Sequence, residues 1–143
     1  MNDLHALQRF VDAQAPVYRA VQAELRAGAK TSHWMWFIFP QLAGLGHSPT
    51  AQFYGITSLD EARAFLEHAV LGANLRKTVE ALLPWRHDRT AEQILGPVDA
   101  IKLRSSLTLF DQIEPNGVFA CALEGFYFGR HDERTLALLN SAR

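Results

Sequence analysis

Residues 30–48 read KTSHWMWFIFPQLAGLGHS, the stretch of the chain that is densest in aromatic side chains. Two of the three tryptophans and four of the fifteen aromatic residues lie between Trp34 and Phe39. Such side chains bury large apolar areas, so we expect this segment to form a hub on which other elements pack. Polar groups that donate, accept or exchange protons flank the aromatic residues, namely Lys30, His33, Gln41 and His47. A ligand is therefore expected at the edges of the hub.

The overall composition is that of a globular protein of single-domain length. The 143 residues include 14 basic and 15 acidic side chains, and the net charge of −1 gives no support to a nucleic-acid partner. No apolar run approaches the roughly 18 residues of a membrane span, and the charged amphipathic start argues against a secretory signal. We therefore expect neither a membrane association nor export.

A single cysteine limits the chemistry of the chain further. Cys121 has no second cysteine to pair with, which excludes an intrachain disulfide and argues against a cysteine-based zinc site. The presence of only one cysteine favours a reducing, cytoplasmic setting. Because it lies inside an apolar run without an activating neighbour, it is predicted to be buried and inert.

Apolar residues recur at three- and four-residue spacing along most of the chain, which is typical of amphipathic helices. Capping residues, prolines and glycines then mark where helices are expected to begin and end. In the first half these are a helix from an Asn2 or Asp3 cap to about Gln14, one from Pro16 to Gly28, a short one capped by Thr31 or Ser32 and interrupted by Pro40, and one begun by Ser48 and Pro49. They continue with a helix over 59–67 behind a Ser58–Glu61 capping box, one over 71–82 ended by Pro84, a short one capped by Thr90 and Gln93, one from Pro97 to the turn at 114–117, a buried one over 118–128, and a last one capped by Asp132.

Signals for β-structure are weak throughout. No segment alternates with period two, and there is no internal repeat or low-complexity linker. We therefore predict an all-α fold, a single compact domain over residues 1–143 with about seven to nine short helices. If any segment is extended, we expect it at Phe37–Phe39 or Val118–Ala120.

Familiar catalytic and cofactor motifs are missing from the sequence. It has no glycine-rich phosphate loop, no dinucleotide-binding glycine motif, no H-E-x-x-H, no G-x-S-x-G and no paired cysteines. We therefore expect no cofactor and no metal site. What remains is a set of polar residues embedded among large apolar ones.

His33 is the first candidate for chemistry. It stands beside Trp34 and Trp36, and an imidazole with an ordinary pKa near ~6.5 can act as a general acid or base. The alternative is that it caps or packs a helix. The neighbouring aromatic residues have two interpretations as well: they form the core, or they form a stacking wall for a planar ring or a cage for a cation.

A second group of polar residues follows Pro97. Asp99, Lys102 and Ser106 fall on one face of a helix, so an acid, an amine and a hydroxyl can point together into a cleft. The alternative is a solvated Asp–Lys pair, with serine hydroxyls that face solvent or donate to backbone carbonyls of the preceding helical turn. The candidate ligand-binding residues are Lys30, Trp34, Trp36, Gln41, Ser48, Tyr54, Asp99, Lys102, Ser105 and Ser106.

Five segments of the chain together resemble a known family. They are SHWMWFIFPQLAGLGHSPTAQFYGI at 32–56, SLDEARAFL at 58–66, HAVLGANL at 68–75, ILGPVDAIKLRSSLTLF at 94–110 and FGRHDERTLALL at 128–139. In these blocks the chain is similar to the bacterial DUF1810 family, also grouped as Rv1873-like proteins. The resemblance implies a small, mainly helical domain of no established biochemical function.

The family's pattern of polar and aromatic residues carries over to particular positions of this chain. In the first blocks these are Lys30, His33, Trp34, Trp36, Pro40, Gln41, Gly44, Gly46, Ser48 and Tyr54, and in the later block Asp99, Lys102, Ser105, Ser106, Thr108 and Phe110. The chain departs from the pattern at His68, which Ala69 follows where the family often has proline.

Two functions fit these observations. The first is a cytoplasmic helical domain whose one pocket binds a small planar or nucleotide-like anionic molecule. If such a domain is an enzyme, His33 is the expected acid or base and Lys102 the anion holder, for hydrolysis or transfer on a glycosidic or phosphate-bearing substrate. The second is a non-catalytic module that docks a protein partner or a second copy of itself through exposed aromatic side chains.

Overall fold

The computed structural model describes residues 5–141, and this part of the chain is helical without a β-strand. Leu42 and Ile56 form an isolated parallel bridge within this range. The helices are α1 (Gln8–Gln14), α2 (Tyr18–Arg26), α3 (Met35–Ile38), α4 (Pro49–Phe53), α5 (Leu59–Glu67), α6 (Leu71–Leu82), the 3-10 turn η1 (Leu83–Trp85), α7 (Ala91–Leu95), α8 (Pro97–Ile113), α9 (Val118–Tyr127) and α10 (Glu133–Ser141). The predicted all-α fold is confirmed, with ten α-helices in the described range where seven to nine were expected.

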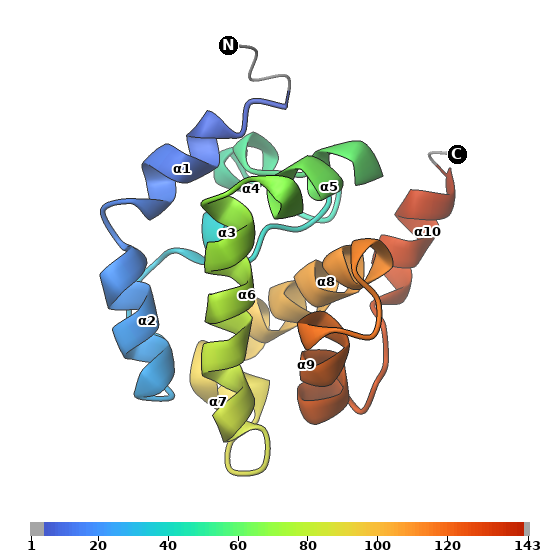
Figure 1. Ribbon diagram of the computed structural model, residues 1–143. Helices are drawn as coiled ribbons and strands as arrows, with labels where there is room; N and C mark the ends of the chain where they lie inside the picture. The colour runs from blue at the N-terminus through green and yellow to red at the C-terminus, as the bar shows by residue number, and fades with distance from the viewer. Residues whose placement is uncertain (1–4, 142–143) are drawn as a thin grey trace.

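Helices α6 and α8 form the centre of the fold (Figure 1). Helix α6 packs against α2, α5 and α9, while α8 packs against α5, α7, α9 and α10. A row of buried rings runs through this centre: Phe10 contacts Phe65 at 5.1 Å, Phe65 contacts Phe110 at 5.5 Å, and Phe110 contacts Phe119 at 5.8 Å between ring centroids. None of the helices in residues 5–141 is long and apolar enough to cross a membrane.

Several helix caps form as the sequence predicts. The Ser48 hydroxyl accepts the Ala51 amide at the start of α4, and Thr90 and Gln93 form a complete capping box on α7. The Asp132 carboxylate accepts the Thr135 amide at the start of α10. The apolar run from Val118 is a helix, as expected. The proposed cap at Asn2 or Asp3 lies outside the described residues, but α1 begins only at Gln8, after Ala6 with its positive φ of 51°, so the first helix starts later than predicted.

Two other local predictions are wrong, because the polar groups have hydrogen-bond partners other than the expected ones. Thr31 and Ser32 do not cap α3; their amides donate to the Glu24 carboxylate at 2.7 and 3.1 Å. Ser58 caps α5, but Glu61 turns away from it and accepts the Thr57 amide at 2.8 Å. Helix α3 ends at Ile38, two residues before Pro40, as predicted for a helix that a proline stops.

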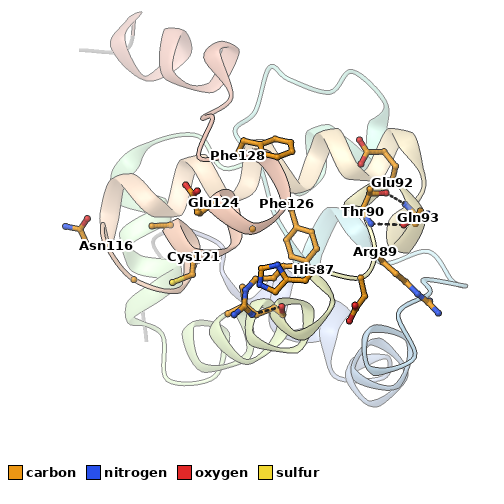
Figure 2. A pocket seen from close by; sticks show the side chains of 16 residues that line it. His87, Arg89, Thr90, Glu92, Gln93, Asn116, Cys121, Glu124, Phe126 and Phe128 are labelled. Atoms are coloured by element: carbon orange, nitrogen blue, oxygen red, sulfur yellow. Dashed lines mark hydrogen bonds between the residues drawn. The ribbon is translucent and has the colours of Figure 1, made fainter.

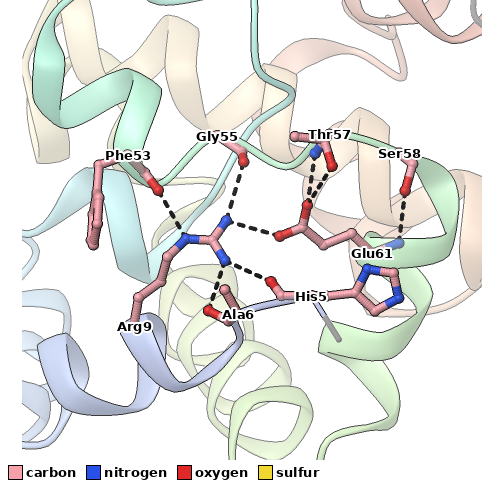
Figure 3. Close-up of polar contacts among 8 residues, drawn as sticks. All are labelled: His5, Ala6, Arg9, Phe53, Gly55, Thr57, Ser58 and Glu61. Carbon is pink, nitrogen blue, oxygen red and sulfur yellow. Dashed lines mark hydrogen bonds and ion pairs between the residues drawn. The ribbon is translucent and has the colours of Figure 1, made fainter. Parts of the chain in front are cut away.

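Glu61 and Arg9 form a buried polar hub between α1 and α5 (Figure 3). Their side chains are 3% and 14% exposed and meet at 2.8 Å. The Arg9 guanidinium also donates to the carbonyls of Phe53, Gly55, His5 and Ala6 at 2.7–3.2 Å. One arginine thus ties α1 to the segment between α4 and α5.

The Glu24 carboxylate connects α2 to the start of the aromatic segment. It accepts the Ser32 hydroxyl at 2.6 Å and the Trp34 indole N–H at 3.0 Å, in addition to the two amides. Burial acts to raise the pKa of Glu24, but the hydrogen bonds from Ser32, Thr31 and Trp34 outweigh it and lower the pKa from 4.5 to about 2. The charged form of Glu24 therefore stabilises the folded state.

This low pKa predicts an acid-sensitive contribution to stability. Since the folded pKa lies below the ordinary value, the contribution is present above about pH 4.5 and is lost as the pH falls toward about 2. We expect Glu24→Gln to be less stable at neutral pH and to lose less stability than the wild type between these pH values. Urea unfolding over a pH series measures this, with the exposed Glu80→Gln as control. Parallel curves for Glu24→Gln and the wild type would contradict the assignment.

Candidate functional site

The two blocks singled out in the sequence meet in the structure. The Lys30 ammonium lies 2.9 Å from an Asp99 carboxylate oxygen, and the two side chains are only 8% and 18% exposed. The backbone amide of Lys30 also donates to the Ile94 carbonyl at 2.8 Å. Lys30 is thereby held against the start of α8, with its ammonium 5.1 Å from the centre of the Trp34 ring.

Lys102 stands on the other side of the same carboxylate. Its ammonium is 3.8 Å from the second Asp99 oxygen and 5.1 Å from the centre of the Trp36 ring, which it covers. The contact to Asp99 is long for an ion pair, and the side chain of Lys102 is 23% exposed. Two ammonium groups around one carboxylate leave one positive charge beside an aromatic ring.

A narrow crevice opens beside Lys102. It is lined by Trp36, Phe39, Gln41, Ala51, Tyr54 and Lys102. Its volume of about 10 Å³ is room for roughly one water molecule, because the lysine covers the indole. Within residues 5–141 the Trp36 indole N–H, the Gln41 amide and the Tyr54 hydroxyl form no hydrogen bond with protein, although all three side chains are half-buried. Polar groups that converge without partners are available to a ligand.

Ser106 lies one turn beyond Lys102 on α8. It does not line the crevice, but it too has an unpaired polar group. It is 1% exposed, and its hydroxyl has no hydrogen-bond partner in the described structure. Ser105 and Thr108 behave differently, since each donates to the carbonyl four residues earlier and also contacts Asp132. Ser105 therefore belongs to the attachment of α10 and not to the crevice.

The remaining predicted residues lie outside the crevice. His33 is exposed and does not line it, Ser48 caps α4, and Trp34 is fully buried. Trp34 packs tilted against Phe39 at 6.2 Å, so it belongs to the core. The structure thus brings together Trp36, Gln41, Tyr54 and Lys102, with the Lys30–Asp99 pair beside them.

A larger groove, which the sequence does not predict, lies between α9 and residues 83–93 (Figure 2). Its volume is about 1180 Å³, and it includes the side chains of Arg86, His87, Cys121 and Phe128. Cys121 is exposed on this face, so the prediction of a buried thiol is wrong. The spacing of Cys121 and Gly125 places two small residues on one face of α9, but the Arg86 side chain covers Gly125, so this pattern alone does not predict the exposure of Cys121.

The helices in Figure 1 recur in a solved structure. The chain is similar to the conserved hypothetical protein Rv1873 from Mycobacterium tuberculosis, with 51% identity and a TM-score of 0.93 over 96% of this chain and 99% of that chain. No curated protein matches the chain. The family model described as a protein of unknown function, DUF1810, matches residues 4–139. The chain therefore belongs to the DUF1810 family.

Proposed function

We propose that the chain binds a small planar anionic molecule, nucleotide-like in chemistry, at the crevice between Trp36 and Lys102. The observation that carries the proposal is the position of Lys102, an ammonium group that lies over a half-buried indole beside hydrogen-bonding groups that have no partner among residues 5–141. A planar ring would take the place of this ammonium on the face of Trp36. The ammonium would then move to the anionic group of the ligand.

The charges around the crevice favour an anion. Lys30 is already neutralised by Asp99 at 2.9 Å, whereas Lys102 contacts the same carboxylate only at 3.8 Å. Moving Lys102 therefore leaves Asp99 with its closer partner. Lys30 and Asp99 act as positioning residues, since they fix the start of α8 against the aromatic segment.

The cost of moving Lys102 is of the same order as the gain from stacking, so the hydrogen bonds and the anion contact must supply the net affinity. A cation–π contact at a partly exposed site contributes about 0.5–1 kcal/mol, and a loose surface ion pair contributes about as little. Stacking of one nucleobase on an aromatic side chain contributes about 1–3 kcal/mol. The Gln41 amide and the Tyr54 hydroxyl then supply hydrogen bonds that set the orientation of the ring.

Binding measurements with two matched variants test the proposal. The probes are nucleoside monophosphates and aromatic carboxylates, followed by calorimetry and by quenching of tryptophan fluorescence. We expect Lys102→Met and Trp36→Leu each to weaken binding about tenfold or more, which corresponds to about 1.4 kcal/mol. Lys77→Met, which removes an exposed lysine of α6, serves as the control and should bind as the wild type does.

The same experiment separates binding from catalysis. His33 is exposed outside the crevice lining, so His33→Ala should leave affinity unchanged in a pure binding domain. A loss of turnover of a glycosidic or phosphate-bearing probe in His33→Ala, with affinity retained, would instead support a hydrolase or transferase. Equal affinities of Lys102→Met and the wild type would overturn the proposed site.

A further inference from the structure

We infer that Asn116 and Gly117, in the turn between α8 and α9, form a site of spontaneous chemical modification, at which the Asn116 amide is converted to a carboxylate through a cyclic imide. The modification needs no enzyme and no cofactor, since water is the only co-reactant. Both residues line the groove between α9 and residues 83–93, and neither lines the crevice at Trp36. The inference is therefore independent of the proposed function.

Both reacting groups lack hydrogen-bond partners within residues 5–141. The Asn116 side chain is exposed at the edge of the groove, and its amide forms no hydrogen bond with this part of the chain (Figure 2). The backbone N–H of Gly117, the residue before the start of α9, donates to no acceptor there either. The side-chain carbonyl carbon and the backbone nitrogen can thus approach each other without loss of a hydrogen bond in the fold. Glycine also leaves that nitrogen unshielded, since it has no side chain.

The other asparagines of the described chain are held differently. Asn74 and Asn140 lie inside α6 and α10, so the amide that follows each of them belongs to a hydrogen-bonded helix. The Asn74 side chain also donates to Gln14 at 3.2 Å. Ring closure at either residue requires its helix to open first, whereas ring closure at Asn116 breaks no helical bond. Among the asparagines of residues 5–141, Asn116 is therefore the expected site.

Water alone balances the chemistry. The Gly117 nitrogen loses its proton and forms a bond to Cγ of Asn116, the bond from Cγ to Nδ2 breaks, and ammonia leaves with the released proton. Water then opens the resulting cyclic imide on one of its two sides. Cleavage of the bond from Cγ to the nitrogen gives aspartate. Cleavage of the bond from the backbone carbonyl carbon to the nitrogen gives isoaspartate, in which the main chain runs through the former side chain.

The products place a negative charge at the start of α9. Gly117 is the N-cap of this helix and makes no side-chain cap, and the first turn of α9 has no acidic residue. A carboxylate one position earlier is favourable near the free amides of a helix N-terminus, so the aspartate form is expected to fold as the wild type does. The isoaspartate form has one extra backbone carbon between α8 and α9, and is expected to loosen the first turn of α9.

Incubation of the full chain at physiological temperature, followed by peptide mapping with mass spectrometry, tests the inference. We expect the amide of Asn116 to be lost about tenfold or more faster than the amide of Asn74, because α6 lies at the centre of the fold and opens rarely. The conversion should accelerate with rising pH, since the attacking nitrogen must lose its proton. Chromatography separates the two products, with Asn116→Asp as the reference for the aspartate form.

Gly117→Ala is the matched variant. A methyl group at this position meets the Glu114 carbonyl oxygen at 3.6 Å, an ordinary contact, and the φ of −112° suits alanine, so the variant should fold as the wild type does. The methyl group shields the nitrogen, so conversion at Asn116 should slow several-fold while the denaturation midpoint stays unchanged or rises. Conversion at Asn116 that is no faster than at Asn74 in the wild type, or equally fast in Gly117→Ala, would overturn the inference.

Discussion

Replacement of Glu61 by alanine is expected to lower the free energy of unfolding by about 3–5 kcal/mol. Glu61 is 3% exposed and accepts hydrogen bonds from Arg9, the Thr57 amide and the Thr57 hydroxyl. Its removal leaves the partly buried guanidinium of Arg9 without a counter-charge. Such an uncompensated charge is more costly than the loss of the pair itself. Urea unfolding at neutral pH measures the effect.

The neighbouring residue provides the control for Glu61. Asp60 also lies in the first turn of α5, but it is exposed and has no ion pair in the described structure. Asp60→Ala should therefore change stability by only about 0.5 kcal/mol. The double variant Arg9→Met with Glu61→Leu should be less destabilised than the sum of the single variants, because it removes both charges. Additive losses would show that the two side chains act independently.

Replacement of Trp34 by alanine is the second change with a large expected effect. Trp34 is fully buried, contacts Phe39, and donates its indole N–H to Glu24 at 3.0 Å. Loss of this volume should cost about 3–5 kcal/mol and should also release one of the hydrogen bonds that hold the Glu24 carboxylate. Thermal or urea unfolding measures the loss.

Trp36 is the matched comparison in the same segment. Its side chain is half-buried and forms no hydrogen bond within residues 5–141, so Trp36→Ala should cost clearly less than Trp34→Ala. Similar losses for both variants would contradict the division of the aromatic segment into a structural and an accessible tryptophan. A small loss for Trp36→Ala together with loss of ligand binding would support that division.

The helices could be predicted from the sequence because their signals are local. Ser48, Thr90 and Asp132 each cap the helix that follows within three residues, and period-3.6 patterns identify α5, α6 and α8. The contact between Lys30 and Asp99 could not be predicted in this way. Both are candidate ligand-binding residues by their chemistry, but no local pattern specifies that their side chains meet.

The missed features all depend on contacts between distant segments. The Glu24 carboxylate accepts hydrogen bonds from the amides of Thr31 and Ser32 across a turn. Arg9 pairs with Glu61, which lies 52 positions away in the sequence. The exposure of Cys121 depends on how far residues 83–93 stand from α9. Each of these requires the tertiary packing, which no local pattern encodes.

The attachment of α10 has a consequence for how the molecule opens. Its main packing partner is α8, and the segment before it is held by hydrogen bonds from Arg104 to the carbonyls of Arg130 and His131 at 2.9 and 2.8 Å. A helix that packs mainly on one neighbour can detach while the rest stays folded. Native-state hydrogen exchange should therefore show the α10 amides exchanging through a local opening, well before those of α6 and α8. Arg104→Met should speed this exchange in α10 alone.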